Sequence, residues 1–322
     1  MKYFVGIDSG GTKTDCVLVD ECGHIVKRQI SEGCNRYDHG LEKARDRLID
    51  CITNICACSP LPVSAIYGGI AGRIGCILDF KPLLSHVIGD APLLLEDDIE
   101  IMLVGMLGQV EGCGMVCGTG SSLGVVRKGK PLEVIGGRGY IIDTYGSGFA
   151  LAKEGLRYAF RSFDGRSPHT SLQDAFENAL GVKELHDAVG EIYAGGRRFI
   201  ASFAHLVFKC YEEGDWAAKK ILDFGARNMA DMVHTAKRYF EGDFPVVLGG
   251  GIARAYPYYV DMIRSYCPEC ATIILSDTPP VYGSVVKAMA LAGIEATEEI
   301  KETFCREYSE LKQKESKKAS EK

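Results

Sequence analysis

A glycine-rich segment near the start of the chain contains residue types that bind phosphate. In GIDSGGTKTDCVLVD, β-branched and apolar residues follow Lys13, which predicts a strand, a tight turn and a second strand, not the helix that follows a Walker or Rossmann loop. Backbone N–H groups of Gly10 to Lys13 can converge on an anion in such a turn. Asp8 ends the first strand and suits a Mg²⁺ ion held through water. The alternative is a hairpin whose glycines only permit positive φ, with Asp8 as a turn former.

The same arrangement occurs a second time about a hundred residues later. GCGMVCGTGSSLGVVRKGKPLEVIGG, from Gly112 to Gly137, predicts a strand, a glycine turn at Gly118 to Ser121, and two more strands. Two hairpins of matching spacing predict a duplicated α/β domain. Within it, GVVRKGKP matches GxxxxGK, but Pro131 replaces the Ser or Thr and the run spans a hairpin, so a Walker loop is excluded.

Three acidic residues follow a predicted apolar strand, Pro92 to Leu95, and precede a mostly apolar helix. They are Glu96, Asp97 and Asp98. Open α/β sheets bind ligands at the carboxyl ends of their strands, so these acids are well placed for chemistry. The alternative is N-capping of the helix by Asp97 or Asp98, and one acid can cap while another reacts.

A third glycine cluster lies in FPVVLGGGIARAYPYY, where Gly249 to Gly251 separate a strand from a helix. Bare glycine backbone lets a flat ring or ribose come close, and a helix N-terminus can meet phosphate. A helix is predicted over Leu41 to Cys56 from its apolar period.

Composition limits the classes of protein that the chain can belong to. The 322 residues are 46% hydrophobic and 25% charged, with a net charge of −6 and no basic domain, so a nucleic-acid surface is not expected. The N-terminus enters a strand directly and no apolar run is long enough to span a membrane, so we expect a cytoplasmic protein. The pair Cys267 and Cys270 lacks a second pair to complete a zinc site.

Taken in order, these motifs resemble the N-acetylglucosamine kinase and BadF/BadG/BcrA/BcrD ATPase family of the actin, sugar kinase and Hsp70 superfamily. The parts that match are GIDSGGTKTD, EDD, CGTGSS, GGRGYIIDTYGSGFALA and VVLGGGIA. The resemblance implies an α/β fold of two ribonuclease-H-like, actin-like ATPase domains with the nucleotide in the cleft between them. It implies domains over 1–112 and 113–293, and a C-terminal helix and charged tail over 294–322 that docks back on the N-terminal domain.

The resemblance also implies an ATP-dependent sugar kinase that uses Mg²⁺, with Asp98 as general base and Asp8 ordering the metal through water. A homodimer would fit the family as well. Nucleotide and phosphate contacts are implied at Gly10, Gly11, Thr12, Lys13, Gly118, Thr119, Gly120, Ser121, Gly249, Gly250 and Gly251. Acceptor contacts are implied at or near Asn35, Ser122, Arg138, Asp143 and Thr144.

The chain departs from the family where the acceptor is chosen. The usual GGWG…GDEGSG is GGRGYIIDTYGSG here, so Arg138 replaces a tryptophan and Thr144 stands where the sugar-binding Asp is expected. Asp143 could substitute from one residue away, or Arg138 could meet an anionic acceptor. The expected acceptor is a sugar or related small molecule with a hydroxyl. Two other functions fit the motifs: a BadF/BadG-type ATPase that activates a partner enzyme, and a catalytically silent nucleotide-binding sensor.

Overall fold

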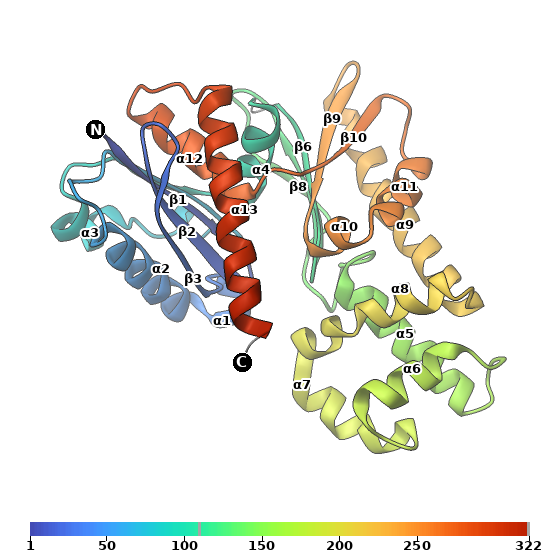
Figure 1. Ribbon diagram of the computed structural model, residues 1–322. Coiled ribbons are helices and arrows are strands. Elements are labelled where there is room, and N and C mark those ends of the chain that lie inside the picture. The colour runs from blue at the N-terminus through green and yellow to red at the C-terminus, as the bar shows by residue number, and fades with distance from the viewer. Residues whose placement is uncertain (109–110, 321–322) are drawn as a thin grey trace. The chain divides into compact units, whose positions relative to one another are not determined.

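The computed structural model describes residues 1–108 and 111–320, which form two compact units. Unit 1 comprises Met1–Val110 and Asp277–Lys322, and unit 2 comprises Glu111–Ser276 (Figure 1). No helix within the described part of the chain is both long enough and apolar enough to cross a membrane.

Unit 1 contains a five-stranded sheet in the order β3-β2-β1-β4-β5. The first three strands are antiparallel, and β4 and β5 run parallel to β1. Its elements are β1 (Tyr3–Ser9), β2 (Lys13–Asp20), β3 (Ile25–Glu32), α1 (Arg36–His39), α2 (Leu41–Cys56), β4 (Ala65–Ile70), η1 (Ile74–Cys76), α3 (Lys81–Ile88), β5 (Leu93–Glu96), α4 (Asp98–Leu107), α12 (Pro280–Leu291) and α13 (Glu298–Ser320).

Unit 2 repeats this sheet, in the order β8-β7-β6-β9-β10 and with the same strand directions. Its elements are β6 (Gly112–Cys117), β7 (Ser121–Val126), β8 (Glu133–Ile135), α5 (Gly148–Phe163), α6 (Ser171–Leu180), η2 (Leu185–Ala188), α7 (Val189–Ser202), α8 (Ala204–Glu212), α9 (Trp216–Ala236), η3 (Lys237–Tyr239), β9 (Phe244–Gly249), α10 (Gly251–Ala255), α11 (Pro257–Tyr266) and β10 (Ala271–Leu275). The predicted duplication and the ribonuclease-H-like fold class are therefore confirmed.

The sheet of unit 1 is covered on both faces because side chains alternate along each strand. Val5 and Ile7 of β1 pack with Leu48 and Ile52 of α2 on one face. Phe4, the intervening residue, packs on the other face with buried residues of α4, α12 and α13. Strands buried on both faces are mostly apolar, which explains why β1 and β4 lack a polar alternation.

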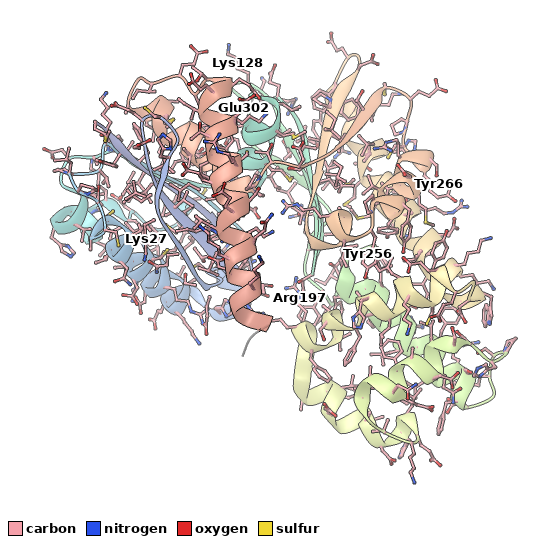
Figure 2. The ribbon with its side chains drawn as sticks, viewed as in Figure 1. Lys27, Lys128, Arg197, Tyr256, Tyr266 and Glu302 are labelled. Atoms are coloured by element: carbon pink, nitrogen blue, oxygen red, sulfur yellow. The ribbon has the colours of Figure 1, made fainter. Side chains whose placement is uncertain are left out.

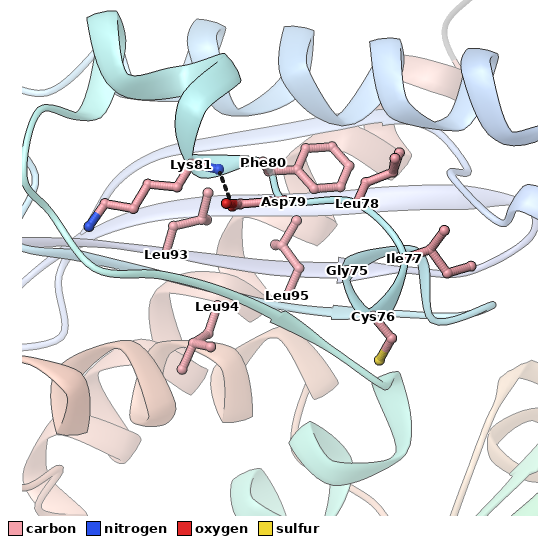
Figure 3. A pocket seen from close by; sticks show the side chains of 10 residues that line it. All are labelled: Gly75, Cys76, Ile77, Leu78, Asp79, Phe80, Lys81, Leu93, Leu94 and Leu95. Atoms are coloured by element: carbon pink, nitrogen blue, oxygen red, sulfur yellow. Dashed lines mark hydrogen bonds between the residues drawn. The ribbon is translucent and has the colours of Figure 1, made fainter.

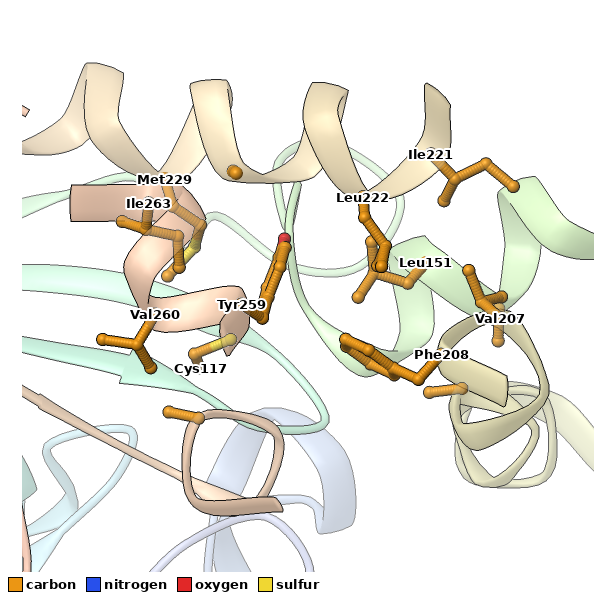
Figure 4. Packing of buried hydrophobic residues seen from close by; sticks show 14 of the residues in the cluster. Cys117, Leu151, Val207, Phe208, Ile221, Leu222, Met229, Tyr259, Val260 and Ile263 are labelled. Carbon is orange, nitrogen blue, oxygen red and sulfur yellow. The ribbon is translucent and has the colours of Figure 1, made fainter. Parts of the chain in front are cut away.

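The core of unit 2 lies between its sheet and helices from the long segment after β8 (Figure 4). Cys117 of β6, Leu151 of α5, Phe208 of α8, Leu222 of α9 and Tyr259 of α11 belong to one buried cluster. The Tyr259 hydroxyl donates a hydrogen bond to the carbonyl of Gly146 at 3.3 Å. The loop before α5 is thereby attached to this core.

The predicted domain boundary at residue 293 needs correction. The chain returns to unit 1 at Asp277, so α12 packs on β1, β4 and α4 of unit 1. Gly283 of α12 makes this packing close, because a Cβ there would meet the backbone of Ile101. The segment that follows β10 therefore belongs to the N-terminal unit, although 166 residues of unit 2 separate it from that unit in sequence.

A buried ion pair attaches the last helix, α13, to the sheet of unit 1. Arg28 of β3 donates from Nε and Nη2 to the two carboxylate oxygens of Asp15 in β2, at 2.9 and 2.7 Å. Tyr308 of α13 donates its hydroxyl proton to the same carboxylate, and the Arg28 guanidinium lies 4.4 Å from the centroid of the Tyr308 ring. Both charged side chains are nearly inaccessible to solvent. Removing one partner of a buried ion pair is destabilising, because the other charge is left buried and uncompensated.

We expect the substitution Arg28→Met to lower the free energy of unfolding by about 3 kcal/mol, because the buried Asp15 carboxylate is left with only the exposed Lys13 ammonium, 3.9 Å away, as a counter-charge among the described residues. Urea denaturation followed by circular dichroism measures the change. Arg45→Met is the matched control, since Arg45 and Asp46 form an exposed ion pair and its loss should cost less than about 0.5 kcal/mol. Equal losses in the two variants would contradict the importance of the buried pair.

Candidate functional site

The second glycine turn, Gly118 to Ser121, is held from behind by the N-terminus of α5. The carbonyl of Gly118 accepts a hydrogen bond from the N–H of Gly148 at 2.8 Å, and that of Thr119 accepts from Phe149 at 3.2 Å. No peptide bond in the described chain is cis, and in a trans peptide the N–H points opposite to the carbonyl. The N–H groups of Thr119 and Gly120 therefore point away from α5.

These two N–H groups have no hydrogen-bond acceptor among the described residues. The next one along, from Ser121, donates to the Thr144 hydroxyl at 3.3 Å. Thr144 in turn donates to Ser147 at 3.0 Å, and Ser147 caps α5. The turn is thus rigidly supported behind and open in front, which is the arrangement of an anion-binding nest.

Unit 2 also brings the third glycine cluster beside this turn. Strands β6 and β9 are parallel neighbours, and Val116 lies opposite Gly249. Gly250 has φ 109°, and a Cβ at that position would meet the backbone of Cys117. A Cβ on Gly118 would lie 3.8 Å from the backbone N of Gly251, whereas one on Gly251 would have no neighbour within 4 Å. The Gly249 to Gly251 segment therefore combines one position that packing requires to be glycine with one that faces open space.

The first glycine turn, in unit 1, is closed by a hydrogen bond from the N–H of Gly10 to the carbonyl of Lys13 at 3.0 Å. The carbonyl of Thr12 accepts from the N–H of Gly33 at 3.3 Å, and Nε2 of His39 lies 3.1 Å from the carbonyl of Gly11. A Cβ on Gly33 would lie 2.5 Å from the carbonyl oxygen of Gly10, so only glycine lets the chain pass so closely behind the turn. Gly33 is not among the predicted site residues, because nothing local in the sequence distinguishes it from a loop glycine.

Asp8 and Asp98 lie at neighbouring points along one edge of the same sheet. Asp8 is paired in register with Gly69 of β4, and Gly69 with Glu96 of β5. A Cβ on Gly69 would lie 3.0 Å from the Cα of Asp98 and 2.5 Å from Cδ1 of Ile101. The missing side chain of Gly69 therefore allows the start of α4 to sit on β4, beside Asp8.

The three acids after β5 have different surroundings. Glu96 accepts a hydrogen bond from the Tyr67 hydroxyl and lies 3.9 Å from the Lys287 ammonium, and Asp97 caps α4 by accepting from the N–H of Ile99 at 3.1 Å. Burial, followed by the negative charges of Asp97 and Asp8, raises the pKa of Asp98 well above its ordinary value. Of the three, Asp98 is the one whose Cα lies against Gly69, beside Asp8, and whose carboxyl has a pKa well above its ordinary value.

Asn35 lies in unit 1, on the short helix that contacts the first glycine turn. Its Oδ1 accepts a hydrogen bond from the N–H of Tyr37 at 2.9 Å and so caps α1. Gly72, in the loop after β4, packs against this oxygen: a Cβ on Gly72 would lie 2.8 Å from Oδ1 of Asn35. The amide oxygen is therefore used within the protein, and the NH₂ group is the part of Asn35 that can donate to a ligand.

The four acceptor candidates in unit 2 have different environments. Ser122 lies on β7 directly beneath Gly137, and Arg138 is exposed and donates to the carbonyl of Val134 at 3.1 Å. Asp143 closes a short turn by donating its N–H to the carbonyl of Gly139 at 2.9 Å. Thr144 is buried, and its hydroxyl takes part in the internal chain that supports the glycine turn.

A pocket of about 390 Å³ lies in unit 1 beside edge strand β5 (Figure 3). It is lined by residues 75–81 and 93–95, which are mostly apolar. The Asp79 carboxylate in its wall accepts a hydrogen bond from the N–H of Lys81 at 3.0 Å. None of the residues predicted to bind nucleotide or acceptor lines this pocket, so we assign no ligand to it.

The donor set near Asp8 suits a metal that keeps most of its water. In the described ranges, no three Asp, Glu, His or Cys side chains are grouped so that they could hold a metal ion directly. Mg²⁺ is commonly bound by one or two carboxylates plus phosphate oxygens and water. Asp8, one carboxylate at the end of β1 beside the first glycine turn, fits that requirement.

Comparison with known proteins matches residues 5–288 to the model of the BadF/BadG/BcrA/BcrD ATPase family. An N-acetylmuramic acid/N-acetylglucosamine kinase from Clostridium acetobutylicum is 26% identical over 83% of this chain and 90% of its own. An N-acetyl-D-glucosamine kinase from Dictyostelium discoideum is 27% identical over 89% of this chain and 98% of its own.

Among solved structures, a candidate N-acetylglucosamine kinase from Chromobacterium violaceum is similar with a TM-score of 0.69. It is 20% identical, and the match covers 91% of this chain and 99% of that one. This similarity supports the two-domain fold independently of the glycine motifs.

The glycines of the site divide into those that packing requires and those that face open space, and substitution should separate the two kinds. We expect Gly33→Ala to lower the melting temperature by several degrees, because its Cβ would clash with the backbone of the first turn. Gly10→Ala should melt within about 2 °C of the natural protein, because a Cβ there has no neighbour within 4 Å. Differential scanning fluorimetry measures both melting temperatures. A Gly33→Ala variant that melts at the same temperature as the natural protein would contradict the packing argument.

Proposed function

The chain belongs to the BadF/BadG/BcrA/BcrD ATPase family, and we propose that it is an ATP-dependent kinase that phosphorylates a hydroxyl of an N-acetylated amino sugar. The match to two amino-sugar kinases over more than four-fifths of the chain carries this proposal. The presence of both glycine turns, Asp8 and Asp98 supports it, since phosphoryl transfer needs groups that hold phosphate and a base that accepts a proton.

In this mechanism Asp98 is the general base. Its carboxylate accepts the proton of the acceptor hydroxyl while the hydroxyl oxygen attacks the γ-phosphorus of ATP. The bond between that phosphorus and the β,γ-bridging oxygen breaks, and ADP leaves with the electron pair. The raised pKa of Asp98 favours this role, because a more basic carboxylate holds the transferred proton better.

Asp8 orders Mg²⁺ through water in this proposal. The ion supplies charge stabilisation for the phosphate oxygens when it is bound. The open N–H groups of Thr119 and Gly120, and the turn of Gly10 to Lys13, hold phosphate oxygens. Gly249 to Gly251 contact the adenosine part of the nucleotide.

Each unit contains residues that we propose as acceptor contacts. In unit 1 the amide NH₂ of Asn35 donates to a sugar oxygen, since its Oδ1 already caps α1. In unit 2 Asp143, Arg138 and Ser122 remain acceptor candidates. We reassign Thr144 to support of the glycine turn, because its hydroxyl is buried and bonded to Ser121 and Ser147.

The decisive measurement is Mg²⁺-dependent ADP release from ATP in the presence of N-acetylglucosamine, N-acetylmuramic acid, glucosamine and glucose. We expect one N-acetylated sugar to stimulate release, and Asp98→Asn to lower kcat by about 10² to 10⁴-fold because the base is lost. Asp79→Asn is the control: Asp79 is exposed, asparagine keeps the Oδ1 that accepts from the N–H of Lys81, and the variant should keep full activity.

Two results would go against this proposal. Release that no sugar alters would favour an ATPase that activates a partner enzyme. Nucleotide binding without any release would favour a sensor.

The pH dependence of the reaction tests the environment of Asp98. Since the protonated acid cannot act as base, kcat/KM should fall as pH falls through the raised pKa of Asp98, at a higher pH than for an ordinary aspartate. Asp97→Asn removes a neighbouring negative charge but keeps an oxygen to cap α4, so it should move this acidic limb to lower pH. A limb that does not move would exclude Asp98 as the titrating group.

A further inference from the structure

An arginine from a distant helix lies against the second glycine turn. Nη2 of Arg197, in α7, is 2.8 Å from the position that a Cβ on Gly120 would occupy. The guanidinium carbon also lies 5.8 Å from the centroid of the Tyr140 ring. Figure 2 labels this side chain on α7. Arg197 thus lies beside Gly120, one of the two residues whose N–H groups point away from α5.

A break in α7 determines where this arginine points. Gly196 has φ 63° and ψ −161°, a conformation that side chains with a Cβ rarely adopt, and it interrupts the helix directly before Arg197. Gly196 therefore changes the direction of the chain immediately before Arg197. Tyr140 connects this arginine to the support of the turn. Its ring packs edge-on against Phe149, and the N–H of Phe149 donates to the carbonyl of Thr119.

The two glycine turns differ in the charge that they carry themselves. In the duplicated alignment that begins at Gly10 and Gly118, Lys13 of the first turn corresponds to Ser121 of the second. The Ser121 N–H is already bonded to Thr144, so the second turn presents only two N–H groups and no cation of its own. A terminal phosphate has three oxygens and at least two negative charges to satisfy.

We propose that Arg197 is a phosphate-binding residue that supplies the missing cation of the second glycine turn. Its guanidinium donates to oxygens of the β- or γ-phosphate held by the N–H groups of Thr119 and Gly120. A guanidinium suits this place because its planar donors match phosphate geometry. The identity of the ligand as a nucleoside triphosphate rests on the proposed function.

Isothermal titration with AMPPNP and with AMP, each with Mg²⁺, tests the assignment on the intact protein. We expect Arg197→Met to weaken AMPPNP binding by about 10 to 100-fold and to leave AMP binding unchanged, since AMP lacks the β- and γ-phosphates. Arg197→Lys should recover part of the loss. Arg198→Met, at the exposed neighbouring position, is the matched control and should bind both nucleotides normally.

Three outcomes would overturn the assignment. Equal loss of AMPPNP and AMP affinity, or a lowered melting temperature, would make Arg197 a structural residue. Unchanged AMPPNP affinity with a raised KM for the acceptor would assign Arg197 to the acceptor. Failure of the natural protein to bind AMPPNP at all would instead overturn the proposed function, so the two failures are distinguishable.

Discussion

The geometry of the trans peptide is the constraint on which the candidate site depends. A carbonyl that is bound behind a turn obliges the N–H of the same peptide to point forward. In unit 2 the N-terminus of α5 binds the carbonyls of Gly118 and Thr119. In unit 1 Gly33 and His39 contact the carbonyls of Thr12 and Gly11. In both units the direction of the turn N–H groups is therefore set by segments outside the turn itself.

The two units use one strand plan but support their turns differently. Unit 1 uses the chain just after β3, where Gly33 and α1 lie against the turn. Unit 2 has the helices α5 to α9 inserted between β8 and β9, and these supply both the support and the nearby cation. The two units thus share the sheet and the glycine turn but differ in the segments that support the turn.

Local patterns predicted the parts of the fold that local chemistry determines. The helix over Leu41 to Cys56 and both glycine hairpins were predicted because hydrophobic period and turn residues are encoded nearby. For Asp97 the sequence left open a role in chemistry or a role as helix cap. The hydrogen bond from the N–H of Ile99 to its carboxylate shows that Asp97 caps α4. Gly69 and Arg197 could not be found in this way, because each acts on a residue brought near only by tertiary packing. The return of the chain to unit 1 at Asp277 was missed for the same reason.

That return has a consequence for how the protein is made. Unit 2 is continuous in sequence, whereas unit 1 is completed only by α12 and α13, which cover Phe4, Val17 and Tyr67. A nascent chain that has emerged only as far as the end of unit 2 would still expose this apolar face of its first sheet to solvent. Of the two units, the one whose synthesis begins first is therefore the one that can complete its packing last.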